Sequence, residues 1–172
     1  TDGGSSTPWC MGGDDNKDWC ELILSTRGQM LNNRPPYQAD NIYGSNYYAY
    51  EFGDTSSHYY RGAYLDCVRA IDFLVTREKV NAKNIFAAGG SQGGSFVYAA
   101  AALDGRLRAI APSITGHADF VDDVKIVSWP ANVFEDCQEA LGITDEEMFT
   151  FLSYFDVKNF ASRIGCPTIT NF

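Results

Sequence analysis

Apolar positions along the chain follow two periods, one typical of helices and one typical of short buried strands. The best helical pattern covers residues 61–80, where apolar side chains recur at i, i+4, i+7 and i+11 from Tyr64 while Arg61 and other charged residues avoid that face. Residues 92–103 are small and rich in alanine, which favours a second helix.

Short apolar runs lie between and around these helices and predict strands. The runs cover residues 21–25, 84–88, 108–112 and 166–171. Strands that alternate with helices favour a mostly parallel sheet with flanking helices, so the predicted fold class is α/β.

Two longer segments interrupt this alternation. Residues 32–57 hold several turn signals, among them Pro35-Pro36, and many tyrosines, which predicts a long excursion loop. Residues 117–160 combine aromatic and acidic side chains with helical stretches, and we expect a lid-like insertion there. The first 15 residues are rich in Gly, Ser and Asp and are typical of a loop.

Composition and charge narrow the classes of function. The chain has 172 residues, of which 45 % are hydrophobic and 20 % charged, as in one compact globular domain. A net charge of −9 and a pI near 4.5 disfavour nucleic acid and membrane as partners and are compatible with a neutral substrate. No apolar run approaches the ~20 residues of a membrane span. The sequence begins with Thr rather than Met, so the compartment stays open.

The five cysteines lack the C-x-x-C spacing of zinc and redox sites, and we expect free thiols. The acidic run at Asp14, Asp15 and Asp18 does not match the spacing of a calcium loop. Neither a metal nor a cofactor is therefore expected.

The segment that carries chemistry is Gly89-Gly90-Ser91-Gln92-Gly93-Gly94. It contains the motif G-x-S-x-G centred on Ser91, after a predicted strand and before a predicted helix. This context is that of the nucleophile elbow of α/β-hydrolases. The sequence therefore predicts that Ser91 is a catalytic nucleophile.

The spacing of this motif has a physical reason. A sharp reversal between strand and helix forces the serine into a strained backbone conformation, and the flanking glycines let strand and helix approach closely. The turn lifts the hydroxyl above the sheet, and the backbone N–H of Gln92 then points at the position where an oxyanion forms. Gln92 is thus the second predicted site residue, through its backbone rather than its side chain.

Two phosphate-binding interpretations fit this loop less well. A P-loop needs a lysine after its last glycine, and none follows here. A dinucleotide-binding turn needs G-x-G-x-x-G, which the glycine spacing fits badly. A turn that merely permits tight packing is the remaining alternative.

The sequence around the elbow resembles one family. The resembling stretches are residues 59–74 before the elbow, Arg27-Gly28-Gln29 further upstream, and residues 156–167 downstream. Together they resemble the acetyl-xylan esterase and cephalosporin C deacetylase family, carbohydrate esterase family seven, from about Glu21 to the end of the chain. The resemblance implies an α/β-hydrolase fold, with residues 1–172 forming a single partial domain that is the nucleophile half, truncated at both ends.

The resemblance also assigns roles to residues. It implies that Ser91 is the nucleophile and that Gln92 donates one oxyanion N–H. Arg27 is expected to support the site by holding a neighbouring acid through two hydrogen bonds, while Met30 stands where the family usually has glycine. Family members are commonly ring-like homo-oligomers, so the expected partners are an acetylated carbohydrate substrate and further copies of the chain or a complementing chain.

The resemblance further marks what the chain lacks. By the family pattern the acid follows the strand at residues 166–171 and the histidine comes later, so both are expected to be absent. A central strand and the loop with the second oxyanion donor are expected to be missing before Glu21, with Trp9, Gly12 and Gly13 as weak candidates for its remnants. Each buried backbone group left unpaired costs about 1–3 kcal/mol, so other segments must complete such a sheet or it must rearrange.

Two histidines could replace the missing base. His58 precedes the long predicted helix and is best explained as a loop or capping residue. His117 follows the strand at residues 108–112, on the edge of the sheet where the elbow lies, with three aspartates nearby at 119–123. Proximity in sequence does not give hydrogen-bond geometry, so a polar loop residue is the favoured interpretation of His117.

Two functions are compatible with these observations. The first is a serine carboxylesterase that removes acetyl groups from xylan or small acetylated sugars through an acyl-enzyme on Ser91. The second is a catalytically incomplete homologue that serves as a binding or assembly subunit through open sheet edges and the aromatic loop with Tyr47, Tyr48 and Tyr50. A peptidase of similar fold is disfavoured by the flanking sequence, although the elbow alone does not fix the acyl group.

Overall fold

The computed structural model describes residues 18–29 and 47–171. Some sequence interpretations fall outside the described residues. They concern Trp9, Cys10, Gly12, Gly13, Asp14, Asp15, Met30 and most of the predicted loop at 32–57.

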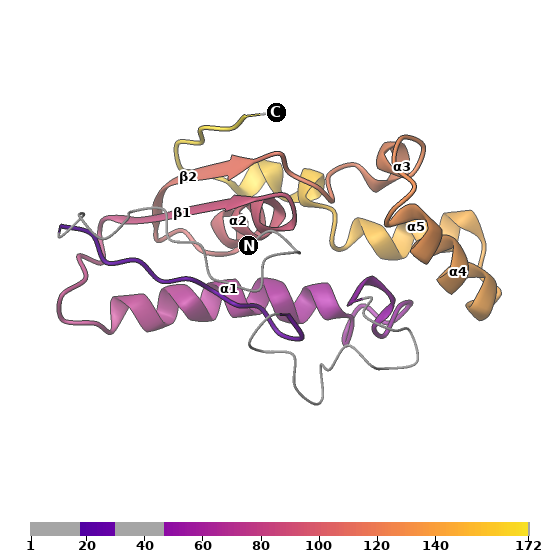
Figure 1. Ribbon diagram of the computed structural model, residues 1–172, viewed down its shortest axis with the longest axis horizontal. Coiled ribbons are helices and arrows are strands. Elements are labelled where there is room, and N and C mark those ends of the chain that lie inside the picture. The colour runs from indigo at the N-terminus through magenta and orange to yellow at the C-terminus, as the bar shows by residue number, and fades with distance from the viewer. Residues whose placement is uncertain (1–17, 30–46, 172) are drawn as a thin grey trace.

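A small parallel sheet forms the centre of the described fold (Figure 1). Its strands are β1 (Ile85–Gly90) and β2 (Leu107–Ser113), and α2 (Gln92–Leu103) connects them. The register pairs Gly90 with Ser113, so both strands end at the same edge of the sheet. The predicted strands at these positions, their parallel direction and the helix between them are confirmed.

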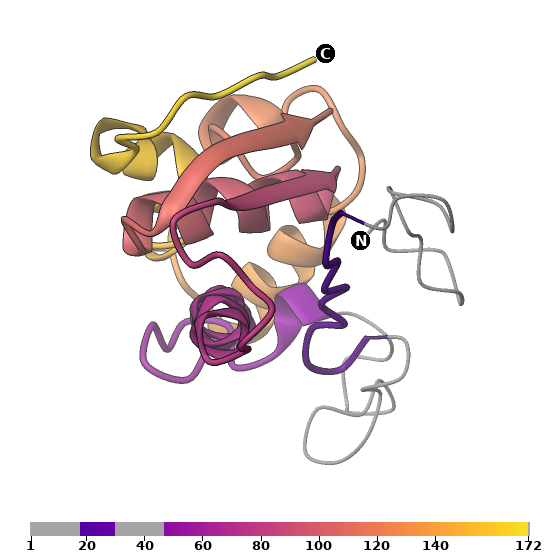
Figure 2. The same ribbon diagram turned by 90° about the vertical axis from the view of Figure 1, so that its left-hand side faces the viewer.

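The helices α1 (Tyr59–Val75) and α2 pack against each other, and α2 also packs on both strands. Figure 2 shows α2 directly beneath the strands and α1, seen end-on, beyond it. α2 is buried almost all round, which explains why small residues dominate it. The predicted helix at 61–80 was too long at its C-terminal end, because its periodic apolar positions stop at Val75 and turns follow up to Val80.

The predicted insertion at 117–160 is largely helical. It contains α3 (Phe120–Asp123), α4 (Ala131–Leu141) and α5 (Asp145–Ser153), and η3 (Val157–Arg163) ends it and packs against α2. The helical stretches expected from the sequence are confirmed, while a lid function for them stays a prediction.

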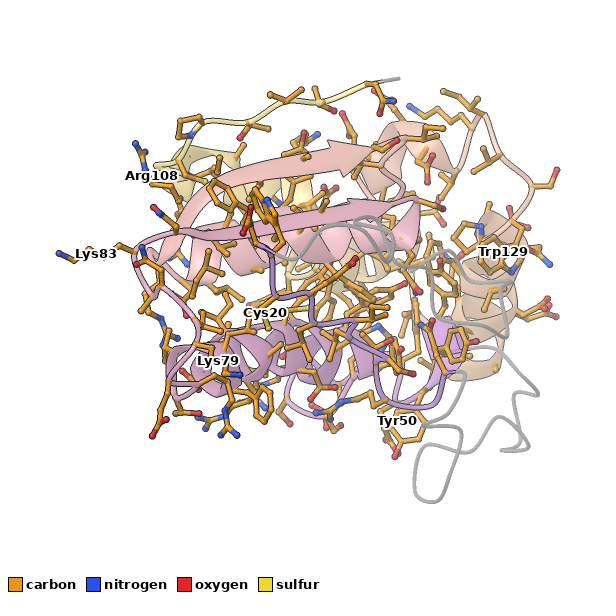
Figure 3. All side chains as sticks on the ribbon, turned by 60° about the vertical axis from the view of Figure 1, so that its left-hand side comes forward. Cys20, Tyr50, Lys79, Lys83, Arg108 and Trp129 are labelled. Atoms are coloured by element: carbon orange, nitrogen blue, oxygen red, sulfur yellow. The ribbon has the colours of Figure 1, made fainter. Side chains whose placement is uncertain are left out.

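The helices α3, α4 and α5 lie beyond the carboxyl ends of the strands (Figure 1). Figure 3 shows Trp129, which precedes α4, at this end of the molecule, whereas Lys83 and Arg108 lie at the opposite end. In parallel α/β sheets the carboxyl edge is where ligands bind, so the insertion stands next to the edge that carries the elbow.

Aromatic rings join these helices to the rest of the core. The 3-10 helix η2 (Tyr47–Ala49) places Tyr48 with its ring centroid 5.5 Å from that of Tyr60 on α1 and 5.9 Å from that of Phe134 on α4. Phe52 similarly lies 4.6 Å from Phe151 on α5. Such ring pairs stabilise a core beyond the area that they bury.

Two of the predicted strands are not complete strands. Residues 21–25 are extended but form no strand among the described residues, because a strand needs a hydrogen-bonded neighbour and the described sheet consists of β1 and β2. Residues 166–171 pair with β2 only through two parallel bridges, Ile110 with Thr168 and Ser113 with Asn171. Their expected position and direction are confirmed, but a full ladder is not.

Two further expectations concern the thiols and the membrane. The four described cysteines are free thiols, as expected; they are Cys20, Cys67, Cys137 and Cys166. Burial raises the pKa of the Cys67 thiol to about 12, so this thiol is unreactive.

Over the described ranges, none of the helices combines the length and the apolar character that crossing a bilayer requires.

Candidate active site

Ser91 occupies the turn between the last residue of β1 and the first residue of α2. Its φ of 53° and ψ of −122° lie in a region that residues other than glycine rarely adopt, and its side chain is exposed. The strained, exposed position that the sequence predicts for this serine is confirmed. Its catalytic role stays a prediction.

The glycines around Ser91 are required by close backbone approach. A Cβ on Gly89 would lie 2.5 Å from the carbonyl oxygen of Gly93, and one on Gly94 would lie 3.2 Å from that of Ser113. Strand and helix can therefore meet at this turn only where these positions lack side chains.

The peptide unit between Ser91 and Gln92 is held in one orientation. The Ser91 carbonyl accepts hydrogen bonds from the N–H groups of Gly94 at 2.9 Å and Gly116 at 3.4 Å. Because a trans peptide places C=O and N–H on opposite sides, the Gln92 N–H points away from these donors. This N–H belongs to the first turn of α2, where helix N–H groups lack intrahelical partners and favour negative charge. The turn can thus supply one donor to an oxyanion next to Ser91.

The side chain of Gln92 forms part of a buried hydrogen-bond network that the sequence did not reveal. Its Oε1 accepts from Nε2 of Gln29 at 2.7 Å, and its Nε2 donates to the Tyr60 hydroxyl at 2.8 Å. Gln29 also donates to the Tyr59 hydroxyl at 2.8 Å. In the sequence, Gln29 stood out only as part of Arg27-Gly28-Gln29. A single sequence does not reveal that side chains so distant along the chain form hydrogen bonds with each other.

Arg27 lies beside this network and pairs with Asp66 on α1. Its Nε and Nη2 donate to the two carboxylate oxygens at 2.7 and 2.6 Å, which is the bidentate arrangement expected from the sequence. Gly62 lies under the guanidinium, where a Cβ would collide with it. The pair fixes the segment that carries Gln29 to α1.

His58 heads α1 and is buried. Its Nδ1 lies 2.8 Å from the carbonyl oxygen of Tyr50, and its ring packs against Phe151 and Phe155. Burial lowers its pKa to about 4, so the ring is neutral at pH 7. His58 occupies the N-cap position of α1, so the interpretation as a capping residue is confirmed for its position, although its side chain makes no cap hydrogen bond.

His117 is buried in the core rather than exposed in a polar loop. Its Nε2 lies 2.7 Å from the Tyr48 hydroxyl and 3.3 Å from the Tyr60 hydroxyl, while its Nδ1 has no partner among the described residues. Burial lowers its pKa to about 4. The interpretation as a loop residue is confirmed for its position after β2, but its burial was not expected, since the aromatic rings that cover this histidine come from η2 and α1.

The aspartates near His117 do not orient its ring. Asp119 pairs with Lys158 at 2.6 Å, and Asp122 pairs with Lys125 at 2.7 Å. The third aspartate, Asp123, makes no hydrogen bond to the imidazole, and burial raises its pKa. Within residues 18–29 and 47–171, the Ser91 hydroxyl has no imidazole or carboxylate within hydrogen-bonding distance, and no three His, Cys, Asp or Glu side chains gather as metal ligands.

The fold and this turn define a class of protein. A parallel sheet with helices packed on it, and a strained serine between strand and helix, define a partial α/β-hydrolase domain. The family model for acetyl xylan esterase (AXE1) matches residues 16–170, and the chain belongs to this family.

Known relatives agree with this assignment. The chain is 32 % identical over 128 residues to acetyl esterase Axe7A of Xylanibacter ruminicola, a match that covers 73 % of the chain and 28 % of that protein. An acetyl xylan esterase from Paenibacillus sp. R4 is similar in structure, with a TM-score of 0.72 and 34 % identity over 84 % of the chain and 47 % of the relative. Acetyl xylan esterase 1 from Thermoanaerobacterium sp. JW/SL YS485 has a TM-score of 0.58 and 26 % identity over 68 % of the chain and 38 % of the relative. The chain therefore spans less than half the length of these relatives.

Proposed function

We propose that the chain is the nucleophile half of a serine acetyl esterase that acts on acetylated xylan or small acetylated sugars. The observation that carries this proposal is the exposed Ser91 in a strained turn, next to the N–H of Gln92, which points away from the donors that hold the Ser91 carbonyl. The names of the relatives, acetyl esterase and acetyl xylan esterase, support an acetyl group as the one transferred.

The reaction proceeds through an acyl-enzyme. The Ser91 oxygen attacks the acetyl carbonyl carbon while a base takes the hydroxyl proton, and the oxyanion accepts a hydrogen bond from the Gln92 N–H. The intermediate collapses as the bond to the sugar oxygen breaks and the base returns its proton to that oxygen. Water, deprotonated by the same base, then attacks the acetyl carbon; the bond to the Ser91 oxygen breaks, the base returns the proton to that oxygen, and acetate is released.

The base and its acid are proposed to come from sequence outside the described residues, on the same polypeptide or on a complementing one. Both described histidines are buried and neutral at pH 7, with their hydrogen bonds directed to groups other than Ser91. The greater length of the relatives supports this proposal. We also propose that the chain assembles into a homo-oligomer, as the family resemblance implies.

The second candidate is a binding or assembly subunit that lacks catalysis. Exposed apolar side chains on and beside the sheet favour it: Phe86 on β1 is 46 % exposed, and Ile169, in the segment bridged to β2, is 79 % exposed. The aromatic loop contributes less to such a surface than the sequence predicts, because Tyr48 is only 1 % exposed.

Hydrolysis of p-nitrophenyl acetate separates these candidates. Activity of the chain that is lost in Ser91→Ala and kept in Ser128→Ala, a serine of the α3–α4 connection, supports an esterase whose base lies within the chain. Inactivity that is relieved by the remaining segment of the Paenibacillus relative, again only with Ser91 present, supports an esterase completed from outside. Inactivity in every combination contradicts the esterase and leaves the binding subunit.

A further inference from the structure

The Tyr60 hydroxyl connects two chains of hydrogen bonds that end at the same peptide unit. On one side it accepts from Nε2 of Gln92 at 2.8 Å. On the other it lies 3.3 Å from Nε2 of His117, whose neighbour Gly116 donates its N–H to the Ser91 carbonyl. The N–H of Gln92 and the C=O of Ser91 belong to one peptide unit, so Tyr60 supports both ends of it.

The direction of the hydrogen bond between Gln92 and Tyr60 is defined, because an amide nitrogen can only donate. The Gln92 amide donates to Tyr60, so the hydroxyl proton of Tyr60 is free to point at Nε2 of His117. The Tyr48 hydroxyl lies 2.7 Å from the same nitrogen, so two hydroxyls converge on Nε2 of His117. The network thus extends from Gln29 through Gln92 and Tyr60 to His117.

This peptide unit needs such support because it is strained. A residue with a side chain held at φ 53° costs about 1–3 kcal/mol and persists only where its surroundings enforce it. Rotation of the 91–92 peptide plane would release that strain and swing the Gln92 N–H away from the Ser91 hydroxyl. The buried Gln92 side chain, bound by Gln29 and Tyr60, opposes this rotation.

We infer that Tyr60 is a positioning residue whose hydroxyl keeps the Gln92 N–H aimed at the oxyanion, with His117 holding that hydroxyl in place. The inference rests on the proposed function, since the N–H stabilises an oxyanion only if Ser91 is acylated. It assigns His117 a supporting task and no part in proton transfer to Ser91.

Tyr64 provides a matched control for Tyr60. Both tyrosines lie on α1 one turn apart, both are buried, and each hydroxyl makes a short hydrogen bond. The Tyr64 hydroxyl donates to the Phe155 carbonyl at 2.6 Å and makes no hydrogen bond to Gln92. Tyr64→Phe therefore removes one buried hydrogen bond, whereas Tyr60→Phe removes those to Gln92 and His117 and so touches the elbow.

The test is the backbone order parameter of the Gln92 amide, measured by ¹⁵N relaxation on the whole chain. In the parent protein it should be about 0.85, the value of rigid backbone, and in Tyr60→Phe it should fall towards about 0.6 while Tyr64→Phe leaves it unchanged. Gln92→Met breaks the same hydrogen bond from the other side and should give the same fall, which keeps the test valid if Tyr60→Phe does not fold. An order parameter that stays high in both variants, or falls equally in Tyr64→Phe, would overturn the inference.

Kinetics separate this inference from the proposed function. In whichever form of the protein hydrolyses the acetyl ester, Tyr60→Phe should lower kcat about tenfold with KM unchanged, and Tyr64→Phe should lower neither. An equal kcat in these two variants contradicts the inference even though the esterase stands. A loss of order at Gln92 without any esterase activity supports the positioning role and contradicts the proposed function.

Discussion

Ser91 and His117 both follow a strand of the same sheet, and both have a positive φ, of 53° and 58°. Their side chains lie in opposite surroundings. The Ser91 hydroxyl is exposed and has no partner among the described residues, whereas the His117 ring is covered by aromatic rings and bound by two hydroxyls. A positive φ after a strand is therefore shared by both residues, while the side chains around each one determine whether it is exposed to substrate or buried in the core.

The largest loss of stability is expected for a substitution in the turn that carries Ser91. Gly89→Ala would place a Cβ 2.5 Å from the Gly93 carbonyl oxygen, and because backbone cannot move aside locally, we expect a loss of about 4 kcal/mol or more in the free energy of unfolding. Chemical denaturation measures it. Gly105→Ala is the control, because no atom lies within 4 Å of its Cβ. Equal stability of the two variants would contradict the tight elbow.

Replacing His117 by alanine should destabilise the protein more than replacing Ser91 by alanine. His117→Ala leaves a cavity and deprives the Tyr48 and Tyr60 hydroxyls of a hydrogen-bond partner, so the free energy of unfolding should fall by about 2–4 kcal/mol. Ser91→Ala removes only an exposed hydroxyl and should change it by less than about 0.5 kcal/mol. Similar losses in both variants would show that the two environments do not differ as described.

The elbow could be predicted from the sequence because its determinants are adjacent residues. The spacing of Gly89, Ser91 and Gly93 between a strand and a helix was enough to place the turn and the Gln92 N–H. The burial of His117 could not be predicted, because Tyr48 and Tyr60, which cover it, come from distant segments.

The strand predictions were limited in the same way, because a single sequence does not reveal which distant segments pair. An apolar run reports burial but not a hydrogen-bonded neighbour, so residues 21–25 were predicted as a strand although no described strand pairs with them. The run at 166–171, also predicted as a strand, joins β2 through two parallel bridges, so its direction was predicted but its neighbour was not. The Gln29–Gln92 contact was missed because a single sequence does not reveal which distant polar side chains meet.

The two buried histidines should make the stability of the protein depend on pH. Burial lowers the pKa of His58 and His117 from 6.5 to about 4, so the unfolded chain binds protons between these values that the folded chain does not. Stability present above pH 6.5 is therefore lost as the pH falls towards 4, by at most about 1.4 kcal/mol per pH unit for each histidine. Urea denaturation across this range measures the slope. His117→Asn should reduce the slope; an unchanged slope would mean that this ring is not buried neutral.

The smallest expected effect concerns the ion pair that fixes the Gln29 segment. Arg27→Lys replaces the two hydrogen bonds to Asp66 by one point contact, and we expect a loss of about 1 kcal/mol in the free energy of unfolding, limited by partial exposure. Arg69→Lys, whose side chain is 82 % exposed in its pair with Asp72, should change stability by less than about 0.5 kcal/mol. Thermal unfolding of both variants tests the difference, and equal values would contradict a supporting role for Arg27.

The central claim is that the Ser91 hydroxyl becomes acylated, and the acyl-enzyme itself is the most direct test. The protein is mixed with p-nitrophenyl acetate, alone and together with the remaining segment of the Paenibacillus relative, quenched in acid and mapped by peptide mass spectrometry. We expect one acetyl group on the peptide that contains Ser91, absent in Ser91→Ala. An acetyl group found only on other residues, or ester hydrolysis that continues in Ser91→Ala, would contradict it.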